Sequence, residues 1–211
     1  MIDYIKLAFF MFCDALAEGN LSELFRLVIF RNKIAIPTEL DLTKTQFDKI
    51  NLDEKFQLIE LKTDELNSKK WEFAVLCRRI KAYRNLKRGQ RGFAVSTGVV
   101  IVGDTWIVVP DGQRNVIKHP DLKMLGIECE PGDVYGFDMF IAPDYRGNNL
   151  AVPLLLYTQT TLKLDGYNKI YAYNWEDNVP AMRFHRKLKY RELPKRRVSR
   201  FFFYEQFEDV K

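Results

Sequence analysis

One short turn in the second half of the chain combines residue types that could hold a phosphate group. The segment IAPDYRGNNLAVPLL, residues 141–155, places Arg146, Gly147 and two asparagines between an apolar strand-like run and an apolar run of helical length. The first N–H groups of a helix have no partner within the helix, and the helix dipole adds partial positive charge there. A glycine lets the backbone approach a ligand closely, and an arginine adds a fixed cation. The turn could therefore bind a pyrophosphate; the other interpretation of this stretch alone is a surface bend.

The elements on either side would place this turn at a ligand-binding edge. Residues 134–141 are almost all apolar, as in a central buried strand, and residues 149–164 predict a helix that stops at Asp165-Gly166. Residues 169–173 predict the next strand. Such a strand–helix–strand segment forms a right-handed parallel crossover. Ligands of open sheets bind beyond the carboxyl ends of the strands, where this turn lies.

The chain as a whole predicts one α/β domain with two extra helices in residues 1–32, packed on the core. The run LAFFMFC is interpreted as part of an amphipathic helix, because it is too short to span a membrane and follows Asp3 instead of a basic cluster. Phe10, near the polar stripe of this helix, leaves a peripheral contact with a partner or a membrane lipid open. The further predicted elements are a strand at 33–42, an ambiguous polar segment at 40–66, a helix at 71–88 stopped by Gly89, a hairpin of 92–96 and 99–109, a loop at 111–132, a helix at 178–188 and a last strand at 198–207.

Two motifs, in order, resemble those of the GNAT superfamily of acyl-coenzyme A N-acyltransferases. The first is Arg146-x-x-Asn149-x-Ala151, preceded by Pro-Asp-Tyr, and it resembles the phosphate-binding motif of that family, with Asn149 in place of the usual glycine. The second is NVPAMRFHRKLKY, residues 178–190, with His185 at a position where the family often has tyrosine. The resemblance covers residues 93–207. It implies a single domain over residues 1–211, with a mixed, mostly antiparallel, twisted sheet flanked by helices.

The reaction that the resemblance implies is direct attack of a primary amine on an acyl thioester, with acetyl-coenzyme A as the default donor. His185 is the candidate proton donor to the departing thiolate; the structural alternative is a partly exposed helix residue. Asp138 is the candidate base, because a carboxylate in an apolar strand is costly to bury unless it has a function or a partner. An arginine partner or a bulge position would also account for it. Glu128 and Glu130 are rival bases. The residues implied to bind the carrier are Met139, Phe140, Ile141, Arg146, Gly147, Asn148, Asn149, Leu150, Ala151 and Asn178, the last of which is also a candidate helix cap.

Composition restricts the other classes of function. The net charge is +5, from 33 basic and 28 acidic residues, and the basic runs at 78–91 and 195–200 are typical of solvated faces, so nucleic acid is not expected as a partner. Three widely spaced cysteines and two histidines predict no metal site. They favour a reduced, cytoplasmic setting.

Two alternative functions stay open at this point. A long-chain N-acyl amino acid synthase would use an acyl carrier protein or long acyl-coenzyme A, with the two N-terminal helices walling an acyl tunnel and the basic runs docking the carrier. A catalytically inactive basic binding module would have kept the fold and lost the chemistry. The acceptor of the leading hypothesis is a small-molecule amine whose identity the sequence does not indicate.

Overall fold

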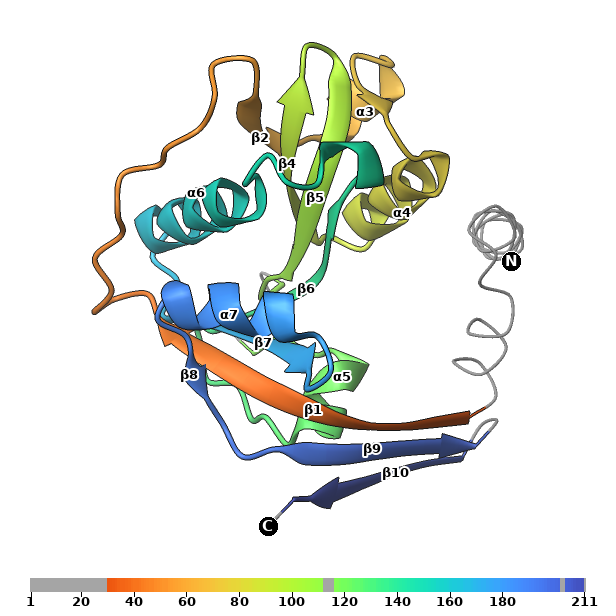
Figure 1. The fold of residues 1–211 in the computed structure, drawn as a ribbon, viewed down its shortest axis with the longest axis vertical. Coiled ribbons are helices and arrows are strands. Elements are labelled where there is room, and N and C mark those ends of the chain that lie inside the picture. The colour runs from red at the N-terminus through yellow and green to blue at the C-terminus, as the bar shows by residue number, and fades with distance from the viewer. Residues whose placement is uncertain (1–29, 112–115, 202–203, 211) are drawn as a thin grey trace.

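The computed structural model describes residues 30–111, 116–201 and 204–210. Within them, ten strands form one sheet with the order β10-β9-β1-β7-β6-β5-β4-β2, while β3 pairs with β5 and β8 pairs with β1 (Figure 1). The strands are β1 (Phe30–Asp41), β2 (Gln57–Leu61), β3 (Glu72–Phe73), β4 (Arg91–Thr97), β5 (Val100–Val108), β6 (Val134–Ile141), β7 (Lys169–Trp175), β8 (Arg191–Glu192), β9 (Arg196–Phe201) and β10 (Tyr204–Asp209). The helices are α3 (Thr63–Asn67), α4 (Leu76–Lys87), α5 (Pro120–Leu125), α6 (Ala151–Leu164) and α7 (Val179–Lys187), with a 3₁₀ turn at Pro143–Tyr145.

The core lies on both faces of the sheet. Because side chains alternate along a strand, Val134 and Tyr135 of β6 belong to opposite faces. Val134 packs in the cluster that includes Leu154 of α6, whereas Tyr135 packs in the cluster that includes Leu122 of α5. Helix α4 contributes Ala82 to a third cluster around Trp106. Helices α6 and α7 therefore cover one face, and α4 and α5 cover the other.

The predicted parallel crossover is confirmed, but its two strands pair only briefly. Strand β6 pairs in parallel with β7 at Val134↔Ile170 and Tyr135↔Tyr171. Beyond these positions β6 continues beside β5, and β7 continues beside β1. The two strands consequently separate toward their carboxyl ends, and the gap between them lies next to α6 and α7.

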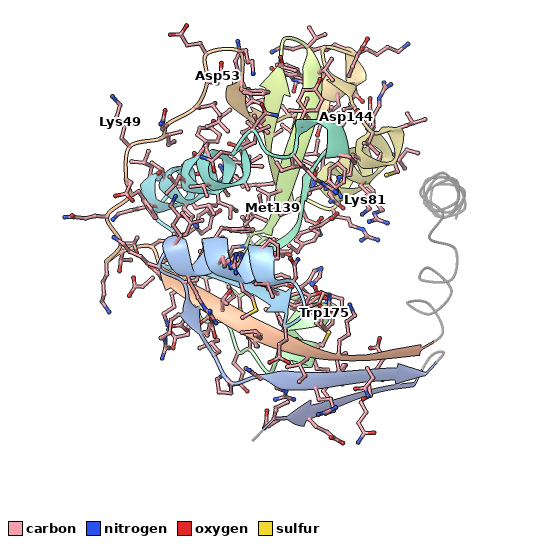
Figure 2. The ribbon with its side chains drawn as sticks, in the orientation of Figure 1. Lys49, Asp53, Lys81, Met139, Asp144 and Trp175 are labelled. Carbon is pink, nitrogen blue, oxygen red and sulfur yellow. The ribbon has the colours of Figure 1, made fainter. Side chains whose placement is uncertain are left out.

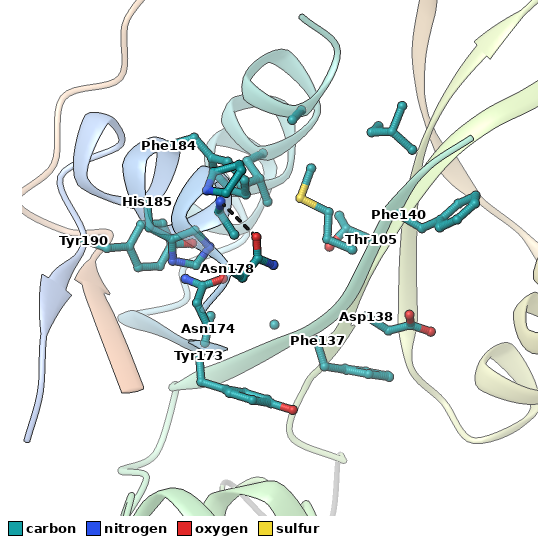
Figure 3. Close-up of a pocket in the computed structure, with 18 of the residues that line it drawn as sticks. Thr105, Phe137, Asp138, Phe140, Tyr173, Asn174, Asn178, Phe184, His185 and Tyr190 are labelled. Carbon is teal, nitrogen blue, oxygen red and sulfur yellow. Dashed lines mark hydrogen bonds between the residues drawn. The ribbon is translucent and has the colours of Figure 1, made fainter. Parts of the chain in front are cut away.

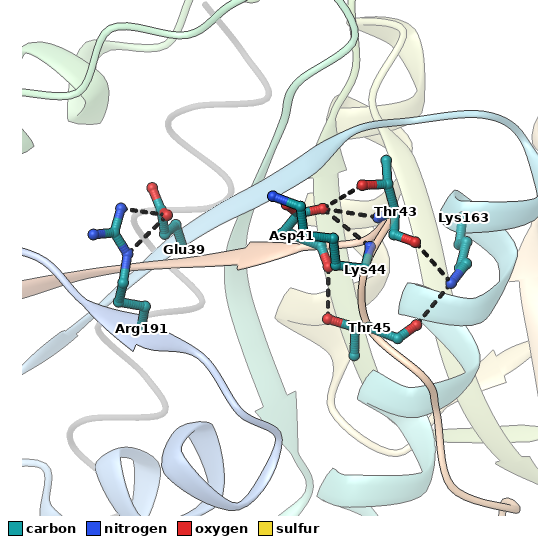
Figure 4. A network of polar contacts seen from close by, with 7 residues as sticks. All are labelled: Glu39, Asp41, Thr43, Lys44, Thr45, Lys163 and Arg191. Atoms are coloured by element: carbon teal, nitrogen blue, oxygen red, sulfur yellow. Dashed lines mark hydrogen bonds and ion pairs between the residues drawn. The ribbon is translucent and has the colours of Figure 1, made fainter.

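A polar turn after β1 ties the end of that strand to α6 (Figure 4). The Asp41 carboxylate accepts hydrogen bonds from Thr43 Oγ1 at 2.6 Å and from the Thr43 and Lys44 amides at 3.0 and 3.2 Å. The hydrogen bonds from Thr43 and Lys44 lower the pKa of Asp41 to about 2. From α6, Lys163 Nζ donates to the Thr45 carbonyl at 2.7 Å. This turn fixes β1, which reaches the functional site at Thr38.

Most of the elements predicted from periodicity are confirmed: β1, the β4–β5 hairpin, β6, α6, β7 and α7. The helix predicted from residue 71 begins only at Leu76, because Glu72–Phe73 pairs with β5. The predicted loop at 111–132 contains α5, which His119 caps by accepting from the Asp121 amide. The last predicted strand is a hairpin of β9 and β10. The ambiguous segment holds β2 and α3.

The two predicted N-terminal helices fall in residues 1–29, outside the described part of the chain. Within the described part, every helix is too short or too polar to cross a bilayer.

Candidate active site

A cleft of about 570 Å³ opens where β6 and β7 separate (Figure 3). Met139 on β6 and Trp175 on β7 lie on its two sides (Figure 2). The sequence-predicted site residues that line it are Asp138, Met139, Phe140, Ile141, Arg146, Ala151, Asn178 and His185. The structure therefore brings most of the predicted site together. Glu128 and Glu130, the rival bases, are exposed and are not among the residues that line this cleft.

The lining comes from both faces of the sheet. Met139 and Ile141 pack against the α6 and α7 cluster. Phe137 packs against the clusters under α4 and α5, and Tyr173 and Trp175 pack against the α5 cluster. The cleft thus offers one wall from each side of the sheet, which suits two substrates that meet within it.

A β-bulge shapes the β6 wall. Phe137 pairs with Trp106 and Phe140 with Asp104, so two residues of β6, Asp138 and Met139, stand opposite one residue of β5. Asp138 has a φ of 52°, a left-handed conformation that aspartate tolerates better than most residues. The bulge places Asp138 on the same face as Phe137, toward α4.

The Asp138 carboxylate is held in a buried ionic network. Arg78 of α4 donates from Nη1 to Asp138 Oδ1 at 2.8 Å and from Nη2 to the Asp138 carbonyl at 3.2 Å. It also forms a bidentate pair with Asp104, and Lys81 Nζ lies 3.3 Å from Asp138 Oδ2. Burial alone would raise the pKa of Asp138, but the two cations more than offset this, so its pKa lies below the ordinary value. Both structural explanations considered for Asp138, an arginine partner and a bulge, are present; its role as a base stays a prediction.

The turn before α6 contains backbone N–H groups that are unpaired within the described residues. Gly147 and Asn149 have φ values of 88° and 55°, so Asn149 adopts the left-handed conformation that glycine favours. The amides of Gly147, Asn149, Leu150 and Ala151 have no hydrogen-bond partner in the described ranges. The Asn148 amide lies 3.5 Å from the Tyr145 carbonyl. The Leu150 side chain is buried in the core and anchors this end of the helix.

The strand edge that leads to this turn also presents backbone groups that do not pair with β5. The Ala142 amide donates to the Val102 carbonyl at 2.8 Å, so Ala142 faces β5. Backbone groups alternate in direction along a strand, so the N–H and C=O of Ile141 face away from β5, toward the cleft. Arg146 Nε reaches the Ile141 carbonyl at 3.3 Å, which confirms that direction.

His185 is buried, with 8% of its surface exposed, rather than partly exposed on the helix surface. Its ring stacks on Tyr190, with ring centroids 4.5 Å apart, and Nδ1 lies 3.3 Å from Thr38 Oγ1. Burial lowers the pKa of His185 to about 4, so the imidazole is neutral at neutral pH. Asn178 caps α7 by accepting from the Ala181 amide at 3.3 Å, as predicted.

Several residues of the site, Thr38, Arg78 and Asn174 among them, were not predicted from the sequence. Thr38 and Arg78 contact the site from β1 and α4, over sequence separations of 147 and 60 residues to His185 and Asp138. Asn174 lines the cleft, and its buried Nδ2 has no hydrogen-bond partner in the described structure. An unsatisfied buried donor costs about 1–3 kcal/mol, which a ligand carbonyl would recover. No local pattern marks Thr38 or Asn174 in the sequence, and Arg78 lies in the basic run at 78–91 whose predicted solvation is wrong for this buried residue.

Comparison with known proteins matches this geometry to one family. The sequence model of the acetyltransferase (GNAT) family matches residues 58–190, more than half of the chain and from an earlier start than the motifs indicate. No curated protein matches the sequence.

Solved structures share the fold at low sequence identity. The chain is similar to a GCN5-related N-acetyltransferase from Sphaerobacter thermophilus, with a TM-score of 0.54 and 11% identity over 90% of this chain and 56% of that one. It is also similar to a tandem GNAT protein from the clavulanic acid biosynthesis pathway, with a TM-score of 0.53 and 14% identity over 84% of this chain and 54% of that one. A glucosamine N-acetyltransferase region of a fungal multi-domain GH3 β-N-acetylglucosaminidase gives a TM-score of 0.59 and 15% identity, over 85% of this chain and 22% of that one. The chain thus spans little more than half the length of the first two.

Proposed function

We propose that this chain, which belongs to the GNAT family of acetyltransferases, is an acyltransferase that moves an acyl group, acetyl by default, from acyl-coenzyme A to a primary amine. The turn before α6 is the observation that supports acyl-coenzyme A as the acyl donor. Arg146 and Ala151 line the cleft, and the unpaired amides of the turn lie between or at these two residues, where a pyrophosphate would accept several hydrogen bonds. The positive φ of Asn149 lets the chain keep this turn without the usual glycine.

The strand edge of β6 gives the carrier a path from the turn into the cleft. The backbone N–H of Ile141 faces the cleft and can donate to a carbonyl group of a pantetheine arm. The thioester would then lie beside Met139 and the bulge. A backbone N–H at this edge, or the unpaired Nδ2 of Asn174, can donate to the carbonyl oxygen as it gains negative charge.

The amine is proposed to enter from the opposite face of the sheet. That wall consists of Phe137, Tyr173 and Trp175, and aromatic faces attract a cationic ammonium group until it loses its proton. His185 lies on the carrier side and is the neutral side chain placed to handle the proton of the reaction. The two substrates would therefore meet between β6 and β7.

Titration calorimetry with acetyl-coenzyme A tests the donor site. Arg146→Ala removes the cation from the turn and should weaken binding by about 10- to 100-fold, the value of one charge-assisted hydrogen bond. Arg183→Ala is the matched control, because Arg183 is exposed on α7 and does not line the cleft, so binding should not change. Failure of acetyl-coenzyme A and of long acyl-coenzyme A to bind to either the wild type or Asn149→Gly would overturn the proposal.

Donors of increasing acyl length, presented on coenzyme A or on an acyl carrier protein, test which acyl group is used. Equal or better turnover of acetyl-coenzyme A is the expected result. A strong preference for long chains or for the carrier protein would favour an N-acyl amino acid synthase. Donor binding without turnover of any amine would favour an inactive binding module.

A further inference from the structure

Thr38 is a buried hydroxyl residue in contact with His185. It lies on β1, opposite Ala172 of β7, and 2% of its surface is exposed. Its Oγ1 lies 3.2 Å from the Ala172 carbonyl oxygen and 3.3 Å from His185 Nδ1. Neither family motif includes this residue, and its strand is distant in sequence from both.

The donors and acceptors in this chain of contacts determine where the protons lie. A threonine hydroxyl has one proton to donate, and a carbonyl oxygen can only accept. The contact with Ala172 therefore uses the hydroxyl proton of Thr38. The contact with His185 then requires the proton to come from Nδ1, and a neutral imidazole that carries its proton on Nδ1 has a lone pair on Nε2.

The surroundings of His185 keep this arrangement in place. The stacking on Tyr190 holds the plane of the ring, and the contact between Nδ1 and Thr38 Oγ1 orients the ring within that plane. Burial raises the pKa of Tyr190 to about 12, so this titratable side chain stacked on the ring stays neutral. The basic residues of α7 next to His185 are exposed, and Arg186 is paired with Glu192 at 2.6 Å. His185 Nε2 makes no hydrogen bond within the described part of the chain, and the side chain lines the cleft.

We propose that Thr38 is a positioning residue that fixes His185 in its Nδ1–H tautomer, so that Nε2 accepts the proton released by the attacking amine. The inference rests on the proposed acyl transfer. As the amine nitrogen bonds to the carbonyl carbon and the carbon–sulfur bond breaks, one N–H proton passes to Nε2. The same proton then passes from Nε2 to the leaving thiolate sulfur, and His185 returns to its starting state. His185 thus accepts a proton before it donates one, whereas the sequence motif suggested a donor alone.

Nitrogen NMR of protein labelled with ¹⁵N-histidine tests the tautomer without any assay of activity. The chain has two histidines, so His119→Gln leaves one imidazole to observe. At neutral pH we expect a protonated, pyrrole-type Nδ1 and an unprotonated, pyridine-type Nε2. A protonated Nε2 would overturn the proposal, whether or not the enzyme transfers acyl groups in the same preparation.

Thr38→Val and Thr38→Ser test the link from tautomer to turnover. Valine has nearly the shape of threonine without the hydroxyl, so it should shift His185 toward the other tautomer and lower kcat by about 10- to 100-fold, part of the usual contribution of general acid–base catalysis. The KM for acetyl-coenzyme A should stay unchanged, and serine should retain the wild-type tautomer and rate. A fall in kcat without a change of tautomer in Thr38→Val would reduce Thr38 to a structural role and refute the proposal. If wild-type enzyme turns over no amine, the proposed function fails, while the NMR result still decides the tautomer.

Discussion

The perturbation that most directly tests the description of the site is Arg78→Met. Arg78 is 5% exposed at its side chain and connects α4 to Asp104 on β5 and to Asp138 in the β6 bulge. Burial alone would lower the pKa of the guanidinium, but the two carboxylates raise it above its ordinary value, so Arg78 is charged. Methionine keeps much of the apolar stem and removes the charge.

The expected cost follows from what is left behind. The Asp104 side chain is 2% exposed and would remain buried without its main cation. Breaking a buried pair by removing one partner costs about 3–5 kcal/mol. For a domain of this size that lowers Tm by about 6–20 °C. Arg191→Met is the matched control, because the Arg191 side chain is 71% exposed in its pair with Glu39, and a surface pair contributes at most about 1 kcal/mol.

Urea unfolding of both variants, repeated at several pH values, measures the difference. Burial raises the pKa of Asp104 and Arg78 lowers it, so removal of Arg78 leaves burial dominant and raises the pKa further. A carboxyl group whose folded pKa is raised stabilises the fold at low pH and loses that contribution as pH rises. The penalty of Arg78→Met should therefore shrink as pH falls. The double variant Arg78→Met with Asp104→Asn should recover part of the loss at pH 7. Equal losses in Arg78→Met and Arg191→Met, or no recovery with Asp104→Asn, would refute the assigned network.

Three further predictions concern single residues of the cleft. Burial lowers the pKa of His185 from 6.5 to about 4, so the folded protein resists protonation of this ring. The free energy of unfolding should therefore be highest above about pH 6.5 and fall by about 3 kcal/mol toward pH 4. His185→Phe should remove most of this fall in urea titrations at pH 7 and 4.5. Asn149 has a φ of 55°, so Asn149→Ala should lower the unfolding free energy by about 1 kcal/mol, while Asn149→Gly should leave it nearly unchanged and tighten acetyl-coenzyme A binding in calorimetry. Asn178→Ala should cost about 1 kcal/mol through loss of the α7 cap, and Asn178→Asp should retain it in thermal denaturation; a neutral Asn178→Ala would contradict the capping role.

The sequence was sufficient to predict the parts of the site that depend on local pattern. The apolar run of β6 and the N-cap asparagine of α7 are strong signals, because each is decided within a few residues. The acidic residue in that apolar run correctly suggested either an arginine partner or a bulge. By contrast, one continuous strand was predicted for residues 198–207, because an apolar run such as FFFY looks like a single strand, whereas β9 and β10 are two strands that pair with each other.

The parts of the site and the fold that were not predicted depend on contacts between segments distant in the sequence. Thr38 has no unusual neighbours in the sequence, and Arg78 begins the basic run at 78–91 that was predicted to be a solvated face, although Arg78 itself is buried. The roles of both residues arise only when β1 and α4 pack beside the cleft. The two-residue strand β3 is similar, because Glu72–Phe73 has too few residues to show a period and is fixed by pairing with β5. Periodicity therefore predicted the helix that follows, α4, but placed its first residue too early in the sequence.

The Arg78 network and the cleft both depend on the bulge in β6. The bulge puts Phe137 and Asp138 on the α4 face in succession, and alternation then resumes, so that Met139 and Ile141 face α6 while Phe140 lies under the Arg78 guanidinium. If β6 paired regularly with β5, every residue after Phe137 would move to the opposite face. The Asp138 carboxylate would then point into the apolar cluster beneath α6, away from both cations. The buried charges thus oppose the regular register, and the register they favour is the one that leaves the backbone of Ile141 open to the cleft.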